Sequence, residues 1–479
     1  MTSLVNPGKS VLEFMASTDP ERTLLGHLAA AVDQAAEPRC AWQPGRPLRL
    51  LLAGYLGAGN VGSDMRSGEI VRQVRYLLGR DNVAFDAIAS SDDLPAEVLA
   101  DVRPRRFNGY FPEILTALVA EHDGVIACEG SMFKSNFSNV LSAIMAASLG
   151  MASRAGKLAV GYGAEVAPMD PPLAAFVREN AAQALTLCRN EASRALAADL
   201  GLRAVAGADT AWTLAASGRA RGEALLRELG WNGSDPVLCV CPVNPFWWPV
   251  KLDPLMEAQM RRTGAHKRLA YTTSFFFHSE SPERERKYGR YVEQVALAAT
   301  ELARSMGAFT VLVAMERLDV AACRDVAAQL PAGAPVLLGA NRRVGDVVAL
   351  LRRADLLVSS RFHALVGAMP AGGPSIGVTM DERIRRLFAQ PGAGERFVEA
   401  DDEDLAARVV AAARGLDADA VRSAARSTVS AAVEMLGHMG LAFADELARV
   451  LPAFPLPSRP RTWQAHLAPL PPDIQALLA

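Results

Sequence analysis

The chain has 479 residues, of which 50% are hydrophobic, 21% charged and 6% aromatic. These values exclude a disordered, collagen-like or disulfide-scaffold protein and predict two or three domains of roughly 100–200 residues each. The formal net charge of -2 provides no overall basic field that would attract nucleic acid. No apolar run approaches the roughly 20 residues of a membrane span, and the six cysteines include no C-x-x-C pair. We therefore expect a cytoplasmic enzyme with reduced, packed cysteines.

The expected elements follow one another in a regular order. Residues 1–47 are predicted to be a helical N-terminal extension, and residues 48–235 alternate short apolar strands with amphipathic helices. After a turn, the same alternation resumes over residues 236–400. This is typical of βαβ units in parallel sheets, so we predict two Rossmann-like domains facing a cleft. Residues 401–479 are predicted to form helices and then an extended proline-rich tail.

The junction after the first strand is rich in glycine. It contains G-x-G-x-x-G at Gly57, Gly59 and Gly62, with Asp86 at the end of the next strand and a helix expected over Gly68–Leu78. Three interpretations stay open: a dinucleotide site, a structural tight turn, or a polar turn that binds substrate. The polar side chains that favour the third interpretation are Asn60, Ser63 and Asp64.

Two strand-to-helix junctions of the second half carry cations. Arg361 and His363 flank Phe362 at the start of a helix, and Arg383 follows the next strand. Parallel strands present their carboxyl ends at one sheet edge, so the two junctions are expected to be neighbours. A fixed cation and an imidazole suit an anionic substrate that undergoes proton transfer. The alternative is an ordinary helix start with a surface arginine and a half-buried histidine.

A third cation lies in the first half. Arg189 ends a strand-like run, where it could bind an anion or pair with Glu191 or Asp199. Asp209 ends the next extended run, as a helix cap or as a functional group.

Together these junctions resemble the polysaccharide pyruvyltransferase family, whose members have two Rossmann-like halves similar to those of B-type glycosyltransferases. The resemblance spans about residues 48–390. The matching pieces are the glycine-rich turn 54–64, the turn Glu129-Gly130-Ser131, the segment 188–193 followed by Asp209, and the segments 360–365 and 380–383.

The resemblance implies transfer of a pyruvyl group from phosphoenolpyruvate to hydroxyls of a saccharide or related acceptor, giving a ketal and phosphate. It implies no metal or redox cofactor. His363 would act as general acid or base, and Asp64 would orient the acceptor or share the proton transfers. The implied substrate-binding residues are Gly59, Asn60, Ser131, Arg189, Arg361 and Arg383.

Two other functions remain open at this stage. One is a B-type glycosyltransferase that uses a nucleotide sugar, and the other is a catalytically silent binding protein of the same fold. The aromatic segment 244–288 could be a lid, an acceptor platform or an interface. Peripheral contact with a lipid-linked substrate and self-association also stay open.

Overall fold

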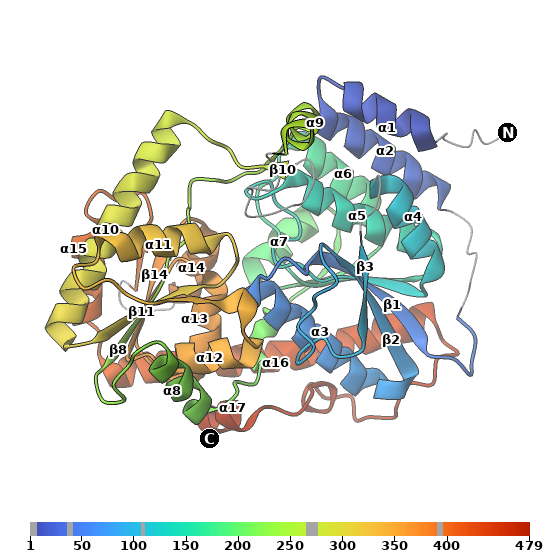
Figure 1. Cartoon of the computed structure of the whole chain (residues 1–479). Coiled ribbons are helices and arrows are strands. Elements are labelled where there is room, and N and C mark those ends of the chain that lie inside the picture. Colours follow the sequence, from blue (N-terminus) through green and yellow to red (C-terminus); the bar gives the residue numbers. More distant parts are fainter. Residues whose placement is uncertain (1–6, 36–41, 107–110, 265–275, 390–395) are drawn as a thin grey trace.

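The computed structural model describes residues 7–35, 42–106, 111–264, 276–389 and 396–479 (Figure 1). Two parallel sheets, each covered by helices, make up most of the chain. This confirms the predicted α/β class with two Rossmann-like domains. Cys40 lies outside the described residues, and the other five cysteines are buried and free.

The first sheet is built from seven parallel strands in the order β3-β2-β1-β4-β5-β6-β7. Alternate residues of β1 face opposite sides: Leu50 and Leu52 enter one core, Leu51 and Ala53 the other. Helices therefore cover both faces. The strands are β1 (Leu48–Leu56), β2 (Val83–Ala89), β3 (Val102–Arg106), β4 (Gly124–Ala127), β5 (Leu158–Ala164), β6 (Leu185–Cys188) and β7 (Arg203–Val205). The helices are α1 (Pro7–Ala16), α2 (Pro20–Gln34), α3 (Val61–Leu78), α4 (Phe111–Glu121), α5 (Asn139–Arg154), α6 (Pro171–Ala181) and α7 (Glu191–Asp199).

The second sheet has six parallel strands in the order β12-β11-β8-β13-β14-β15. Its core packs the buried face of α10 against these strands. The strands are β8 (Val237–Cys241), β11 (Phe309–Ala314), β12 (Val336–Leu338), β13 (Leu356–Ser359), β14 (Ser375–Thr379) and β15 (Phe397–Glu399). The helices are α8 (Arg219–Glu228), α10 (Pro282–Met306), α11 (Asp319–Gln329), α12 (Val344–Arg353), α13 (Phe362–Ala368), α14 (Glu382–Phe388) and α15 (Leu405–Arg414).

Both sheets reverse their strand order at one point. In the first sheet β1 lies between β2 and β4, and in the second β8 lies between β11 and β13. Ligands of open α/β sheets bind beyond the carboxyl ends of the strands at such a reversal. The turns after β1, β4 and β13 are therefore the places where the fold positions a site, and they hold most of the candidate residues.

Helix α3 begins earlier than the predicted Gly68, at Val61. Asn60 is its N-cap residue, and its Oδ1 accepts a hydrogen bond from the Ser63 amide at 3.0 Å. The glycine-rich turn is thus short, and Asp64 already lies in the first helical turn. The prediction was wrong because polar and glycine residues were taken as loop, whereas here they are buried against the second domain.

The segment between β8 and α10 crosses to the first domain. It contains the short antiparallel strands β9 (Lys251–Leu252) and β10 (Phe276–Phe277) and the helix α9 (Pro254–Thr263). The Val250 amide donates to the Phe137 carbonyl at 2.8 Å, and the Trp248 ring packs edge-on against Phe137 at 5.0 Å. Part of this aromatic segment, including Phe275, lies outside the described residues.

The C-terminal region joins the two domains. Helix α16 (Ala418–Val450) runs from the second domain along the base of the first (Figure 1), and its Phe443 packs 6.0 Å from the ring of Tyr162 in β5. After a largely extended stretch, α17 (Pro472–Leu478) ends the chain beside α16. The tail contacts α3 on the way, since Gln73 Nε2 donates to the His466 carbonyl at 2.5 Å.

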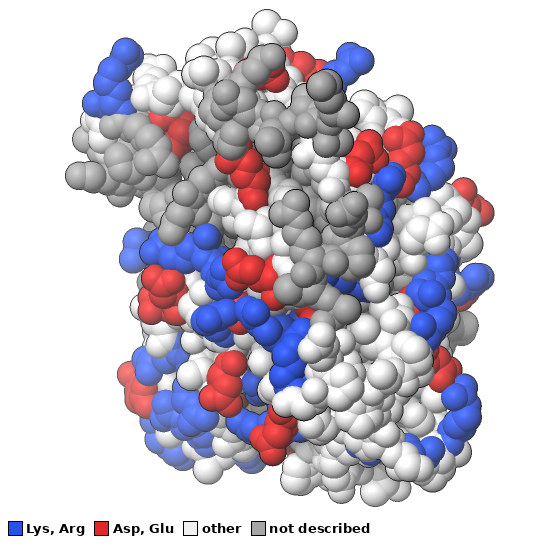
Figure 2. Space-filling model, turned by 90° about the vertical axis from the view of Figure 1, so that its right-hand side faces the viewer, with Lys and Arg blue, Asp and Glu red and all other residues white. Residues whose placement is uncertain are grey.

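Charges of both signs are mixed on the surface. Figure 2 shows Lys and Arg side chains interspersed with Asp and Glu over the face seen there. On the edge strand β3, Arg103 and Arg105 both bind the Asp86 carboxylate, and Arg106 pairs with Asp92. None of the helices in the described part of the chain combines the length and the hydropathy that a membrane crossing requires.

Candidate functional site

The glycine-rich turn after β1 is packed against the second domain. Gly57 and Gly59 have φ of 74° and 70°, in the left-handed region that favours glycine. The amide of Val61 donates to the Met315 carbonyl at 2.9 Å. A Cβ on Gly62 would lie 2.3 Å from Nδ1 of His363, so only glycine allows this histidine to approach α3. The turn therefore contacts the second domain and leaves space for the His363 imidazole beside α3.

A buried carboxylate, Asp209, connects this imidazole to two arginines. Its Oδ2 lies 2.5 Å from the Arg189 guanidinium, 3.1 Å from Arg66 Nε and 3.5 Å from His363 Nε2. Burial raises the pKa of Asp209, but the Arg189 and Arg66 charges outweigh burial and hold it well below its usual range. Oδ1 accepts from the Ala211 amide at 2.9 Å, so Asp209 is a cap and a charge centre at once.

Arg66 and Arg189 are almost fully withdrawn from water, with side chains 0% and 2% exposed. The remaining donors of Arg66 reach main-chain carbonyls, including that of Cys128 at 2.6 Å. Arg189 does not pair with Glu191 or Asp199; its second partner is Glu165, at 2.9 Å. The Arg189 guanidinium also lies over the Phe362 ring at 4.6 Å, which brings it beside the His363 helix.

The pKa of the His363 imidazole is lowered by its surroundings. Burial lowers its pKa, Asp209 acts in the opposite direction, and the charges of Arg189 and Arg66 lower it further, so the net shift is downward. At 3.5 Å, its contact with Asp209 is long for a hydrogen bond. A neutral imidazole with a free nitrogen can accept a proton from a substrate hydroxyl.

Asp64 is a second buried group that can exchange a proton near neutral pH. Burial, followed by the charges of Glu97 and Glu316, raises its pKa to about 7. Its Oδ1 is buried and has no hydrogen-bond partner in the described part of the chain. Among the described residues, no hydrogen bond or ion pair joins Asp64 to His363. Asp64 and Gly62, which His363 contacts, project about 200° apart around α3.

Arg361 belongs to a separate cluster. Its Nε lies 2.9 Å from Asp319 Oδ2 and its terminal nitrogen 2.8 Å from Glu316, so two carboxylates offset its charge. Glu316 also accepts from Asn60 Nδ2 at 2.9 Å and from the Tyr55 hydroxyl at 3.0 Å. Through Glu316, Arg361 fixes the turn after β1 to the second domain.

Arg383 lies in a third cluster, which Glu165 links to Arg189. Arg383 Nε binds the Asp381 carboxylate at 2.8 Å, and its guanidinium lies over the Phe137 ring at 4.8 Å. Burial raises the pKa of Asp381, but the charges of Arg383 and Lys134 hold it at about 2. Glu165 lies between Arg189 and Arg386, whose guanidinium is 3.2 Å away.

The structure thus brings Arg189 and His363 together through Asp209. Arg361 and Arg383 approach the same domain junction, each already bound to carboxylates. At the turn after β4, the Ser131 amide lies 3.4 Å from Glu129, and Glu129 accepts a hydrogen bond from the Ser63 hydroxyl at 3.3 Å. This contact places Ser131 near the turn after β1.

Sequence reasoning missed six charged residues of these clusters: Arg66, Lys134, Glu165, Glu316, Asp319 and Arg386. Arg66 follows Gly62 by four residues, so it shares the helix face that meets His363. That spacing could have indicated it once the helix start was placed correctly. In the described ranges, no group of three or more His, Cys, Asp or Glu side chains is arranged to hold a metal ion.

Comparison with solved structures finds proteins of similar fold. Among solved structures, Anabaena HepE in complex with UDP-glucose is 12% identical, with a TM-score of 0.51 over 85% of this chain and 100% of the other. The UDP-GlcNAc 2-epimerase of Methanocaldococcus jannaschii is 10% identical, with a TM-score of 0.48 over 77% and 94%. The E. coli ADP-heptose LPS heptosyltransferase II is 12% identical, with a TM-score of 0.38 over 79% and 99%.

At these identities the likeness shows the fold alone, an architecture similar to that of B-type glycosyltransferases. No curated protein sequence matches the chain. The sequence model described as polysaccharide pyruvyl transferase, however, matches residues 60–382, well over half of the chain. The match includes Arg189, Arg361 and His363 and ends one residue before Arg383. The protein therefore belongs to the polysaccharide pyruvyl transferase family and is a transferase.

Proposed function

We propose that the protein transfers a pyruvyl group from phosphoenolpyruvate to two hydroxyls of a saccharide acceptor, releasing phosphate and forming a cyclic ketal. The observation that carries this proposal is the position of His363. It comes from the second domain and meets Asp209, Arg66 and Arg189 of the first. A proton acceptor and buried guanidinium groups thus lie at one domain junction.

The reaction removes one proton from each of two hydroxyls and delivers one proton to C3, and two buried groups at the domain junction are suited to take part. One acceptor hydroxyl adds to C2 of the enolpyruvyl group while C3 takes up a proton. Phosphate then leaves, and the second hydroxyl completes the ketal as its proton is taken up by a base or by phosphate. We assign proton acceptance from a hydroxyl to neutral His363. Asp64, with a pKa of about 7, is partly protonated at neutral pH, and we assign to it the delivery of a proton to C3.

The donor carries a phosphate and a carboxylate, which need cationic partners. We propose that Arg189, Arg361 and Arg383 supply them by exchanging Glu165, Glu316 or Asp381 for donor oxygens. Each displaced carboxylate then needs a new partner. Water or a neighbouring cation such as Lys134 can supply it. Gly59, Asn60 and Ser131 are assigned to contacts with the substrates at the turns after β1 and β4.

Binding experiments on the full chain test the donor. We expect phosphoenolpyruvate to raise the unfolding temperature, because a ligand at 100 times its Kd stabilises the native state by about 2.7 kcal/mol. UDP-glucose and ADP are the comparison ligands, since the similarly folded HepE is known in complex with UDP-glucose. Stabilisation by a nucleotide and none by phosphoenolpyruvate would instead favour a nucleotide-sugar glycosyltransferase.

Turnover tests the role of His363. We expect His363→Gln to keep phosphoenolpyruvate binding and to lose phosphate release over a panel of polysaccharide acceptors, by about 100-fold or more. His438→Gln is the matched control, because His438 is an exposed histidine of α16. If His363→Gln and His438→Gln released phosphate at equal rates, the assignment of His363 would be wrong.

A further inference from the structure

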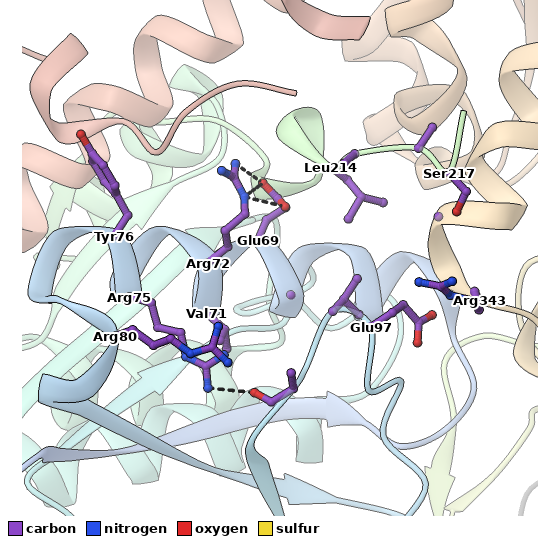
Figure 3. A pocket seen from close by; sticks show the side chains of 16 residues that line it. Glu69, Val71, Arg72, Arg75, Tyr76, Arg80, Glu97, Leu214, Ser217 and Arg343 are labelled. Carbon is purple, nitrogen blue, oxygen red and sulfur yellow. Dashed lines mark hydrogen bonds and ion pairs between the residues drawn. The ribbon is translucent and has the colours of Figure 1, made fainter. Parts of the chain in front are cut away.

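A pocket of about 620 Å³ lies along α3, away from His363 (Figure 3). One wall is the α3 face from Gly68 to Tyr76, continued by Arg80 just after the helix, and the loop of residues 97–100 forms another. The interdomain linker, residues 214–217, and the start of α12 close the far end. Both domains therefore contribute to a cavity whose size is ordinary for a small-molecule site.

The pocket has an excess of positive charge. Its lining includes four guanidinium groups and two carboxylates, which leaves two positive charges over. Arg72 and Glu69 form their own ion pair at 2.6 Å. Glu97 is also engaged, because its carboxylate accepts the Val344 amide of α12 at 2.6 Å. This hydrogen bond leaves the charge of Glu97 in place, so the excess of two positive charges is shared among the other arginines: Arg75, Arg80 and Arg343.

Arg75 and Arg80 lie side by side at one end of the pocket (Figure 3). Burial and the neighbouring Arg80 charge lower the pKa of Arg75. Its buried Nε has no hydrogen-bond partner among the described residues, although a terminal nitrogen donates to the Ala100 carbonyl at 2.8 Å. The partner of Arg80 is Asp101 at 2.7 Å, and both side chains of this pair are mostly exposed, so the pair contributes little stability and Arg80 can exchange Asp101 for an anion at little cost.

The backbone holds this end in place. Asp101 has φ of 60°, which is uncommon for a residue other than glycine. This left-handed residue directly follows the carbonyl that binds Arg75 and carries the carboxylate that binds Arg80.

Arg343 lines the opposite end of the pocket from Arg75 and Arg80, and apolar residues line the space between them. Arg343 is exposed, has no ion pair in the described part of the chain, and points toward Glu97 across the pocket (Figure 3). Val71, Val98 and Leu214 line the middle. Two guanidinium groups suit a phosphate, which accepts hydrogen bonds from several donors at once. The apolar middle suits an uncharged body attached to it.

We propose that this pocket binds a small phosphate-bearing molecule, with its phosphate at Arg75 and Arg80 and its body directed toward Arg343. The site is separate from the proposed donor site and goes beyond the proposed function. A bound molecule contacts both domains and shares Glu97 with the candidate site, because the charge of Glu97 contributes to the raised pKa of Asp64.

Calorimetric titration of the full chain with inorganic pyrophosphate tests the proposal. Arg80→Ala and Arg75→Gln are expected to weaken binding about tenfold or more each, because each removes charge-assisted hydrogen bonds. Arg342→Ala is the matched control, since Arg342 is a surface arginine that pairs with Glu228 and does not line the pocket. Arg80 is exposed, so its variant is expected to fold.

Hydrogen exchange provides a second readout. Pyrophosphate is expected to protect residues 97–101 and the first turn of α12 in the wild type and in Arg342→Ala, and not in Arg80→Ala. The proposal is overturned if the wild type binds no pyrophosphate at millimolar concentration. It is equally overturned if Arg80→Ala and Arg342→Ala bind it alike, which would locate the anion at another site such as the clusters around Arg189.

Discussion

The unpartnered carboxyl of Asp64 gives the protein a pH-dependent stability that can be measured. Burial, then the charges of Glu97 and Glu316, raise its pKa from 3.8 to about 7. One unit of pKa difference between the folded and unfolded states corresponds to about 1.36 kcal/mol. The shift is therefore worth at most about 4 kcal/mol in the free energy of unfolding.

The sign follows from where each state releases its proton. The unfolded chain loses the Asp64 proton near its ordinary pKa, and the folded protein keeps it until about pH 7. Between these values the folded state binds more protons, so the free energy of unfolding falls as the pH rises. In Asp64→Asn this contribution is absent. We expect the wild type to lose stability relative to the variant from about pH 4 to about pH 7, by up to about 4 kcal/mol.

Urea unfolding followed by tryptophan fluorescence, at a series of pH values, measures this difference. Asp93→Asn is the control, because Asp93 is an exposed carboxylate a short distance along the chain. The control is expected to follow the wild type at every pH. A difference between wild type and Asp64→Asn that stayed constant over this range would show that Asp64 titrates normally, and the assigned proton transfer would lose its basis.

Three further changes test the packing around the site. Asp209→Asn leaves two buried guanidinium groups short of a carboxylate, so we expect the free energy of unfolding in urea to fall by about 3–5 kcal/mol. The control Asp445→Asn removes an exposed carboxylate and is expected to cost less than about 1 kcal/mol. Equal losses would contradict the buried network. Gly62→Ala is expected to displace His363 and abolish phosphate release while the far-UV circular dichroism stays native, and an active variant would contradict the close approach. Phe443→Ala is expected to cost about 3–5 kcal/mol by calorimetry, whereas a loss below about 1 kcal/mol would mean that α16 is loosely packed.

The sequence was sufficient for the fold class because the signals for it are local. The apolar run that starts at Leu48, its glycine turn and the helix after it can each be recognised within about 30 residues. The edge at which the strands end was predictable for the same reason, and Arg361 and His363 were found there. The start of α3 was misplaced because Asn60 caps a helix whose first turn is buried by another domain.

The partners of the charged residues could not be predicted from the chain. Arg66 and Asp209 are 143 positions apart, and Lys134 and Glu382 are 248 apart. Local spacing suggested Glu191 for Arg189, whereas burial selects Glu165 and Asp209. Buried ion pairs depend on which strands become neighbours, and local sequence patterns do not reveal this.

The aromatic segment between β8 and α10 shows the same limit. Its composition was compatible with a lid, an acceptor platform or an interface and did not indicate what the rings would face. Trp247 stacks on His278 at 4.5 Å, and Trp248 packs against Phe137 of the first domain. Phe137 in turn lies under the charged groups of Lys134 and Arg383. The segment thus borders the candidate site, which keeps an acceptor platform among the predictions to be tested.

Helix α16 limits how the two halves can move. It is 33 residues long, about 50 Å at 1.5 Å per residue, and it is anchored in the first domain by Phe443 against Tyr162 and by Glu446 bound to Arg203 at 2.8 Å. A wide hinge opening would have to bend this rod or pull those anchors out of the first domain. Helix α16 therefore opposes a wide separation of the two domains.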